Sequence, residues 1–138
     1  MSNRPRILIV DDDRDIVRAL CIRLNAAGFD VDTAHDGLAG VAAAKSGKPD
    51  AIILDIRMPG MDGLTALSRL REQKSTRHIP TIILTANVVE TVRSKALGLG
   101  AYCFLKKPCD PGDLLKTVRG AIGQTDRQAT DGTKPVGN

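Results

Sequence analysis

The chain has 138 residues, of which 42% are hydrophobic, enough for one compact domain with a single core. Its net charge of +4 is spread thinly, and no stretch is long and apolar enough for a membrane span or a secretion signal. The three cysteines are odd in number and lack a CxxC spacing, which favours free thiols over a disulfide framework. These features predict a soluble, cytoplasmic protein without a membrane partner.

Strands and helices are predicted to alternate in five pairs, because short apolar runs are each followed by a segment with helical periodicity. Such alternation favours right-handed crossovers and a parallel sheet between two layers of helices. We therefore expect an α/β, flavodoxin-like, doubly wound (βα)5 sandwich with strand order 2-1-3-4-5. The predicted pairs are Arg6–Val10 with Arg14–Ala27, Asp30–Ala34 with Leu38–Ser46, Ala51–Leu54 with Leu64–Glu72, Thr81–Leu84 with Val89–Leu99, and Ala101–Leu105 with Pro111–Ile122.

Both ends of the chain differ from this pattern. Residues 1–5 form a short N-terminal extension, and residues 6–123 form the domain. From Gln124 onward there is no periodic apolar pattern, so residues 124–138 are expected to be a disordered tail or the stub of a linker. The sequence does not separate these two alternatives.

Polar residues follow four of the predicted strands where each strand ends. They are Asp11 to Asp13, Asp55, Thr85 and Lys107. In open parallel sheets ligands gather beyond the carboxyl ends of the strands, so we expect these side chains to meet at one edge. Several carboxylates beside one ammonium leave excess negative charge, which favours a hard divalent cation such as Mg²⁺ and chemistry on a phosphoryl group.

Four sequence motifs then carry a family resemblance. The segments ILIVDDD, ILDIRMPGMDG, ILTA and FLKKP together resemble the receiver domain of two-component response regulators, over Arg6 to about Gly123. The resemblance covers all the positions that such a domain uses, in the expected order. It is therefore far more specific than any one motif.

The resemblance implies a role for each acidic position. Asp55 is implied to be the phosphoacceptor, a carboxylate nucleophile that takes a phosphoryl group from a phosphohistidine. Asp11 and Asp12 match the acidic pair that holds Mg²⁺, or Mn²⁺ in its place, together with Asp55 and the backbone carbonyl of Arg57. The metal would offset charge on the moving phosphoryl group.

The resemblance also implies a switch. Lys107, which directly precedes Pro108, would pair with Asp55 and later with the phosphoryl group, and the peptide between these two residues is a candidate for the cis form. Thr85 would donate its hydroxyl to the phosphoryl group, with Ala86 leaving room for that group. Phe104 matches an aromatic residue that moves from exposed toward buried as the hydroxyl swings inward, which alters the fourth helix, fifth strand and fifth helix.

Two positions depart from the family pattern, and two others correspond to positions that tune the kinetics of such a domain. Asp13 extends the acidic pair to a triplet and is expected to cap the following helix. Cys109 stands where an aromatic residue is common. Arg57 and Asn87 occupy the two positions that tune the lifetime of the phosphoryl group, which the sequence alone does not predict.

The expected partner is a sensor histidine kinase or a histidine phosphotransfer protein, and the downstream protein partner is not identified by the sequence. The basic cluster Arg69–His78 lacks interleaved aromatic residues, so a solvated helix end is favoured over direct nucleic-acid binding. We expect a monomer at rest, and a phosphorylation-dependent dimer through the fourth and fifth helices stays open.

Three other functions were weighed against a signalling phosphoacceptor that catalyses only its own phosphorylation and dephosphorylation. A phosphatase with an aspartyl-phosphate intermediate needs an acid/base carboxylate two residues after the nucleophile, where this chain has Arg57. A flavodoxin-like cofactor binder needs a glycine-rich phosphate loop or aromatic residues around a flavin, and neither is visible. A scaffold that ignores phosphate is disfavoured by the full acidic set.

Overall fold

Five strands and five helices alternate along the chain. The structure is a computed structural model that describes residues 4–86 and 88–131, with only the backbone for residues 124–131. The strands form one parallel sheet in the order β2-β1-β3-β4-β5, which confirms the predicted fold. The elements are β1 Arg6–Val10, α1 Arg14–Ala26, β2 Asp30–Ala34, α2 Gly37–Gly47, β3 Ala51–Leu54, α3 Gly63–Glu72, β4 Thr81–Thr85, α4 Glu90–Gly98, β5 Cys103–Lys106 and α5 Pro111–Asp131.

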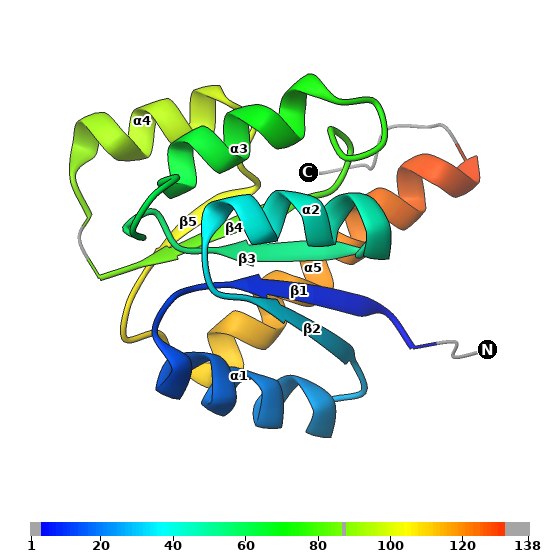
Figure 1. Cartoon of the computed structure of the whole chain (residues 1–138). Helices are drawn as coiled ribbons and strands as arrows, with labels where there is room; N and C mark the ends of the chain where they lie inside the picture. The colour runs from blue at the N-terminus through cyan, green and yellow to red at the C-terminus, as the bar shows by residue number, and fades with distance from the viewer. Residues whose placement is uncertain (1–3, 87, 132–138) are drawn as a thin grey trace.

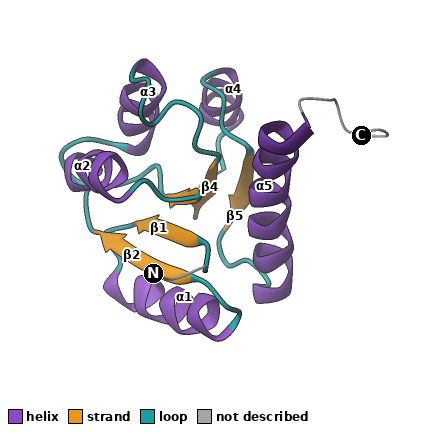
Figure 2. Ribbon diagram, turned by 90° about the vertical axis from the view of Figure 1, so that its right-hand side faces the viewer, coloured by secondary structure: helices purple, strands orange, loops and turns teal. Residues whose placement is uncertain are grey.

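The helices cover both faces of the sheet, with α1 and α5 on one face and α2, α3 and α4 on the other (Figures 1 and 2). Because neighbouring side chains of a strand point to opposite faces, β1 supplies both halves of the core. Ile7 and Ile9 join the apolar cluster under α1 and α5, while Leu8 and Val10 join the cluster under the other three helices. Every residue of β3 is buried, as expected for a central strand of a covered parallel sheet.

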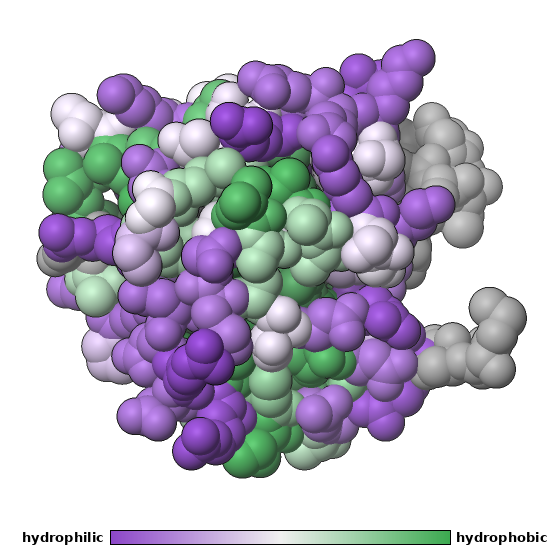
Figure 3. All heavy atoms as spheres, viewed as in Figure 1, coloured by the Kyte–Doolittle hydropathy of each residue, from purple (hydrophilic) through white to green (hydrophobic). Residues whose placement is uncertain are grey.

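Part of the surface over α2 is apolar. Figure 3 shows hydrophobic side chains gathered on this helix, and Leu38 is 67% exposed there. No helix in the described part of the chain has the combination of length and hydrophobicity needed to cross a lipid bilayer.

Two predicted boundaries are wrong. Helix α5 continues through Asp131 instead of ending near Ile122, so residues 124–131 are helical and do not form an irregular tail. Extending an existing helix fixes one residue per added hydrogen bond, so a segment without proline or glycine continues it even when it lacks an apolar face. Strand β5 begins at Cys103, because the Ala101 N–H donates to the Ala96 carbonyl and so belongs to the end of α4.

Candidate functional site

Three aspartates gather at the carboxyl edge of the sheet, where β1 and β3 end. Asp11 and Asp55 are buried, Asp12 is exposed, and one carboxylate oxygen from each lies within 4.8 Å of the others. Backbone hydrogen bonds fix this placement: the Asp55 N–H donates to the Val10 carbonyl at 3.0 Å. Two oxygens bound to one small divalent ion at about 2.1 Å can lie at most about 4.2 Å apart, so these residues fit such an ion with a small adjustment.

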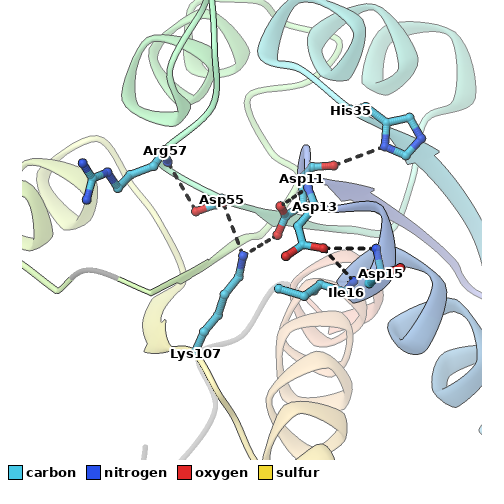
Figure 4. A network of polar contacts seen from close by, with 8 residues as sticks. All are labelled: Asp11, Asp13, Asp15, Ile16, His35, Asp55, Arg57 and Lys107. Atoms are coloured by element: carbon cyan, nitrogen blue, oxygen red, sulfur yellow. Dashed lines mark hydrogen bonds and ion pairs between the residues drawn. The ribbon is translucent and has the colours of Figure 1, made fainter.

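Lys107 brings the compensating charge. Its Nζ lies 2.6 Å from Asp11 Oδ2 and 3.3 Å from Asp55 Oδ2, between the two buried carboxylates (Figure 4). The shorter contact is therefore with Asp11, whereas the sequence analysis expected Asp55 as the partner. The adjacent Lys106 is exposed, since successive side chains of a strand face opposite ways.

The pKa values of Asp11 and Lys107 are both raised in this site. Burial raises the pKa of the Asp11 carboxyl, an effect that the hydrogen bonds from Lys107 and from the Asp13 N–H oppose without reversing it. Burial alone would lower the pKa of Lys107, but its hydrogen bond to Asp11 and the charges of Asp11 and Asp55 outweigh burial and raise it. The ammonium is therefore held in its charged form between two buried carboxylates.

Thr85 ends β4 beside this cluster and carries an unusual hydroxyl. The residue is fully buried, and its Oγ1 has no hydrogen-bond partner among the described residues. Its carbonyl accepts a hydrogen bond from the Lys107 N–H at 2.9 Å, which ties the threonine to the lysine segment. A buried, unsatisfied donor at this edge is suited to an incoming anionic oxygen.

The peptide between Lys107 and Pro108 is cis, in agreement with the expectation from the sequence. Of the other expected switch residues, Ala86 is exposed at the end of β4, and Phe104 is half-buried in β5 against the core under α3 and α4. Asn87 lies outside the described residues.

Residues of the loop after Asp55 lie close to Asp55. The Arg57 N–H donates to Asp55 Oδ1 at 3.3 Å, while the Arg57 side chain is exposed. Gly63, the first residue of α3, leaves no room for a side chain: a Cβ there would touch the Asp55 carbonyl oxygen and lie 2.6 Å from Ile56 Cα. The Arg57 carbonyl, expected as a further metal ligand, stays a prediction.

Asp13 has the structural role that the sequence analysis gave it. Its Oδ1 accepts hydrogen bonds from the Asp15 and Ile16 N–H groups, at 3.1 and 3.2 Å, and so caps α1. The Asp13 N–H in turn donates to Asp11 Oδ1 at 2.9 Å. The cap and the acidic pair are therefore one hydrogen-bonded turn, of which Asp13 is the outer, structural member.

One residue of this edge was missed. His35 follows β2, and its Nδ1 lies 3.2 Å from the Asp11 carbonyl oxygen (Figure 4). Only polar residues that follow apolar runs were predicted to lie at this edge, and β2, with the sequence DVDTA, is not an apolar run. Its position directly after a predicted strand of the same sheet was the signal that could have found it.

The sequence is similar to sequences of known proteins. The chain matches the sequence model of the response regulator receiver domain over residues 7–119. It is 42% identical over 125 residues to the DNA-binding dual master transcriptional regulator RpaA of Synechocystis, and 44% identical over 114 residues to the response regulator PleD of Caulobacter vibrioides. These alignments cover 89% and 83% of this chain but only 51% and 25% of the two relatives, so the chain spans about half the length of one and a quarter of the length of the other.

Solved structures give the same result. The chemotaxis protein CheY4 of Vibrio cholerae is 32% identical with a TM-score of 0.81, covering 86% of this chain and 98% of that one. A CheX-CheY-BeF3-Mg²⁺ complex from Borrelia burgdorferi contains a chain that is 34% identical with a TM-score of 0.79, covering 86% and 89% of the respective chains. With its sequence, its strand order and the edge at which its aspartates meet, this chain belongs to the response regulator receiver domain family of two-component signalling.

Proposed function

We propose that Asp55 accepts a phosphoryl group from the phosphohistidine of a sensor kinase or a histidine phosphotransfer protein, in a reaction that requires Mg²⁺ or Mn²⁺. The observation that carries this proposal is the joint placement of two buried aspartates, an exposed third and Lys107 at one edge of the sheet. The family membership supports it. The domain would be a signalling phosphoacceptor and not an enzyme that acts on other substrates.

In the proposed reaction an Asp55 oxygen attacks phosphorus, and the bond from phosphorus to the donor imidazole nitrogen breaks. Asp11, Asp12 and Asp55, with the Arg57 carbonyl, would hold the cation, which supplies positive charge against the phosphoryl oxygens. Lys107 stands 3.3 Å from Asp55 Oδ2 and would follow the phosphoryl group that forms there. The negative charge of the phosphoryl group would then be shared between the cation and Lys107.

The unpartnered hydroxyl of Thr85 supports a switch. A phosphoryl oxygen on Asp55 would give this buried donor the acceptor that it lacks, and Ala86 would leave space for the group. Phe104 would complete its burial as the β4 end moves, which changes the surface formed by α4, β5 and α5. A protein partner, or an effector region outside this chain, would read that change.

The proposed function also includes a cellular location and an oligomeric state. The domain would act in the cytoplasm, as a monomer at rest, without direct contact to nucleic acid or membrane. A phosphorylation-dependent dimer through α4 and α5 is the open alternative. Arg57 and Asn87 would set the lifetime of the phosphoryl group.

The direct test is intact-protein mass spectrometry after treatment with acetyl phosphate and Mg²⁺. The wild-type chain should gain one phosphoryl group, and Asp55→Asn should gain none. Asp13→Asn is the matched control, because asparagine caps a helix as well as aspartate and should leave labelling unchanged. Labelling of the Asp55→Asn chain to the wild-type level, or its absence from wild type, contradicts the proposal.

The switch needs a separate test with beryllofluoride, which mimics an acyl phosphate. A crystal structure with beryllofluoride and Mg²⁺ should place the Thr85 hydroxyl on a fluoride and Phe104 deeper than its present half-buried position. A bound structure in which both side chains keep their present conformations would leave phosphorylation intact but remove the proposed switch.

A further inference from the structure

Asp11 and Asp12, the two candidate metal ligands that follow β1, are joined by a peptide group that makes a hydrogen bond to the residue after β2. The Asp11 N–H donates to the Ala34 carbonyl at 3.0 Å, which continues the pairing of β1 with β2. One residue further, the His35 ring contacts the Asp11 carbonyl at 3.2 Å. The peptide groups on both sides of Asp11 are therefore anchored to consecutive residues, Ala34 and His35.

The second of these contacts has a fixed direction. A carbonyl oxygen only accepts hydrogen bonds, so Nδ1 of His35 must carry the proton and donate it. The acceptor belongs to the peptide unit that links Asp11 to Asp12, and a peptide unit is planar. The imidazole thus restrains the rotation of the peptide group between Asp11 and Asp12, the two residues that carry the carboxylates.

We propose that His35 is a positioning residue for the cation site: its Nδ1–H holds the Asp11–Asp12 peptide and so raises the affinity of the acidic cluster for a divalent cation. This inference rests on the proposed function. The physical reason is preorganisation, since Asp12 is exposed and would otherwise have to be ordered when the ion binds. His35 does not touch the ion in this proposal and acts through the backbone.

The contact also distinguishes a positioning role from simple packing. Packing needs only the volume of the ring, whereas the proposal needs a donor at the Nδ1 position. Asparagine places a donor amide close to that position, and leucine offers similar volume without a donor. His35→Asn and His35→Leu are therefore a matched pair of variants.

The experiment is calorimetric titration of Mg²⁺ into the metal-free chains, with urea unfolding measured in parallel. We expect His35→Leu to weaken Mg²⁺ binding about three- to ten-fold, the ratio that one net hydrogen bond provides, and His35→Asn to stay within about two-fold of wild type. Equal Mg²⁺ affinity in wild type and His35→Leu overturns the inference and leaves the proposed function standing. Absence of Mg²⁺ uptake by wild type overturns the proposed function and the inference together.

A second measurement does not depend on the variants folding or on the metal. At alkaline pH, where an imidazole is neutral, nitrogen-15 NMR of the histidine rings distinguishes the two tautomers. His35 should be protonated at Nδ1, with the exposed His78 as an internal reference in the same spectrum. A His35 ring protonated at Nε2 would not be able to donate to the Asp11 carbonyl and would overturn the inference.

Discussion

Thr85 carries a hydroxyl that destabilises the resting domain. It is fully buried, and its Oγ1 is without a partner in the described part of the chain, which leaves the donor desolvated and unpaired. Thr85→Val replaces it with an apolar group of the same shape and should raise the free energy of unfolding by about 1–2 kcal/mol. Urea denaturation without Mg²⁺ measures this, and the same variant should lose the beryllofluoride-induced change of Phe104.

Thr81 provides the matched control in the same strand. It is equally buried, but its Oγ1 donates to the Ile79 carbonyl at 3.2 Å and accepts from Arg71 at 3.2 Å. Thr81→Val should therefore lower the free energy of unfolding by about 1–2 kcal/mol, the opposite sign. A loss of stability in both valine variants would mean that the Thr85 hydroxyl has a partner in solution.

Lys107 would compete with a bound cation for the carboxylates of Asp11 and Asp55. Its ammonium lies within hydrogen-bond distance of Asp11 and close to Asp55, so it screens the charge that attracts the metal. Lys107→Met should therefore tighten Mg²⁺ binding by at least about ten-fold, because a monovalent and a divalent cation about 4 Å apart repel each other by roughly 2 kcal/mol even at the dielectric constant of water. Calorimetric titration measures the affinity, and weaker binding in the methionine variant would contradict this competition.

The sequence predicted that polar residues at the ends of strands meet at one edge of the sheet, and their positions at the strand ends were predicted correctly. Asp11, Asp55 and Lys107 each directly follow a strand, Thr85 is the last residue of β4, and the parallel sheet brings these strand ends together. The preference of Lys107 for Asp11 could not be predicted, because it depends on side-chain geometry across strands that are not adjacent in sequence. The His35 contact was missed for a different reason, since a half-exposed edge strand lacks the apolar run that marks a buried one.

At the scale of elements, the junction between the Asp55 loop and α3 is the closest approach found at any glycine in the described residues. A Cβ on Gly63 would touch the Asp55 carbonyl oxygen and lie 2.6 Å from Ile56 Cα, and backbone atoms cannot move aside cheaply. Gly63→Ala should cost about 1–3 kcal/mol of stability and slow phosphorylation by displacing Asp55. Urea unfolding and the rate of labelling by acetyl phosphate measure the two effects.

Gly98, at the end of α4, is the control for this prediction. A Cβ there would meet nothing within 4 Å, so alanine adds helix propensity without a clash. Gly98→Ala should raise the free energy of unfolding by about 0.4–1 kcal/mol. If both alanine variants changed stability in the same direction, crowding at Gly63 would not be the cause.

The ends of helices and strands were predicted less well than their centres, because they depend on contacts with residues elsewhere in the chain. The buried strands were predicted well, because a strand covered on both faces reads as a continuous apolar run. The ends of helices were not, since α5 continues into a polar segment once its first turns are packed through Leu114 and Val118. The start of β5 was misplaced because Ala101 completes the turn that ends α4, a choice that depends on hydrogen bonds to an earlier element.

For the whole molecule, the acidic edge would link the proposed metal binding to global stability. Three clustered carboxylates repel one another in the metal-free fold, and an ion that binds only the folded chain shifts the unfolding equilibrium. Free Mg²⁺ at about ten times its dissociation constant should add about 1.4 kcal/mol to the free energy of unfolding, and EDTA should remove it.

Asp12→Asn tests whether that gain comes from this site. Asp12 is exposed, so the variant removes one carboxylate from the cluster without disturbing the core. It should be insensitive to Mg²⁺ while remaining at least as stable as metal-free wild type. A wild-type Mg²⁺ response in this variant would place the stabilising ion elsewhere on the molecule.

The ion pair between Lys107 and Asp11 joins residues 96 positions apart in the chain. Such a contact is non-local, so it forms only after the loop between its ends has been closed by the folding of nearly all the intervening elements. During synthesis the first aspartates leave the ribosome long before Lys107 does, so an unfinished chain cannot form this ion pair. Under the proposed function, an incomplete domain would therefore not be phosphorylated until its last strand is in place.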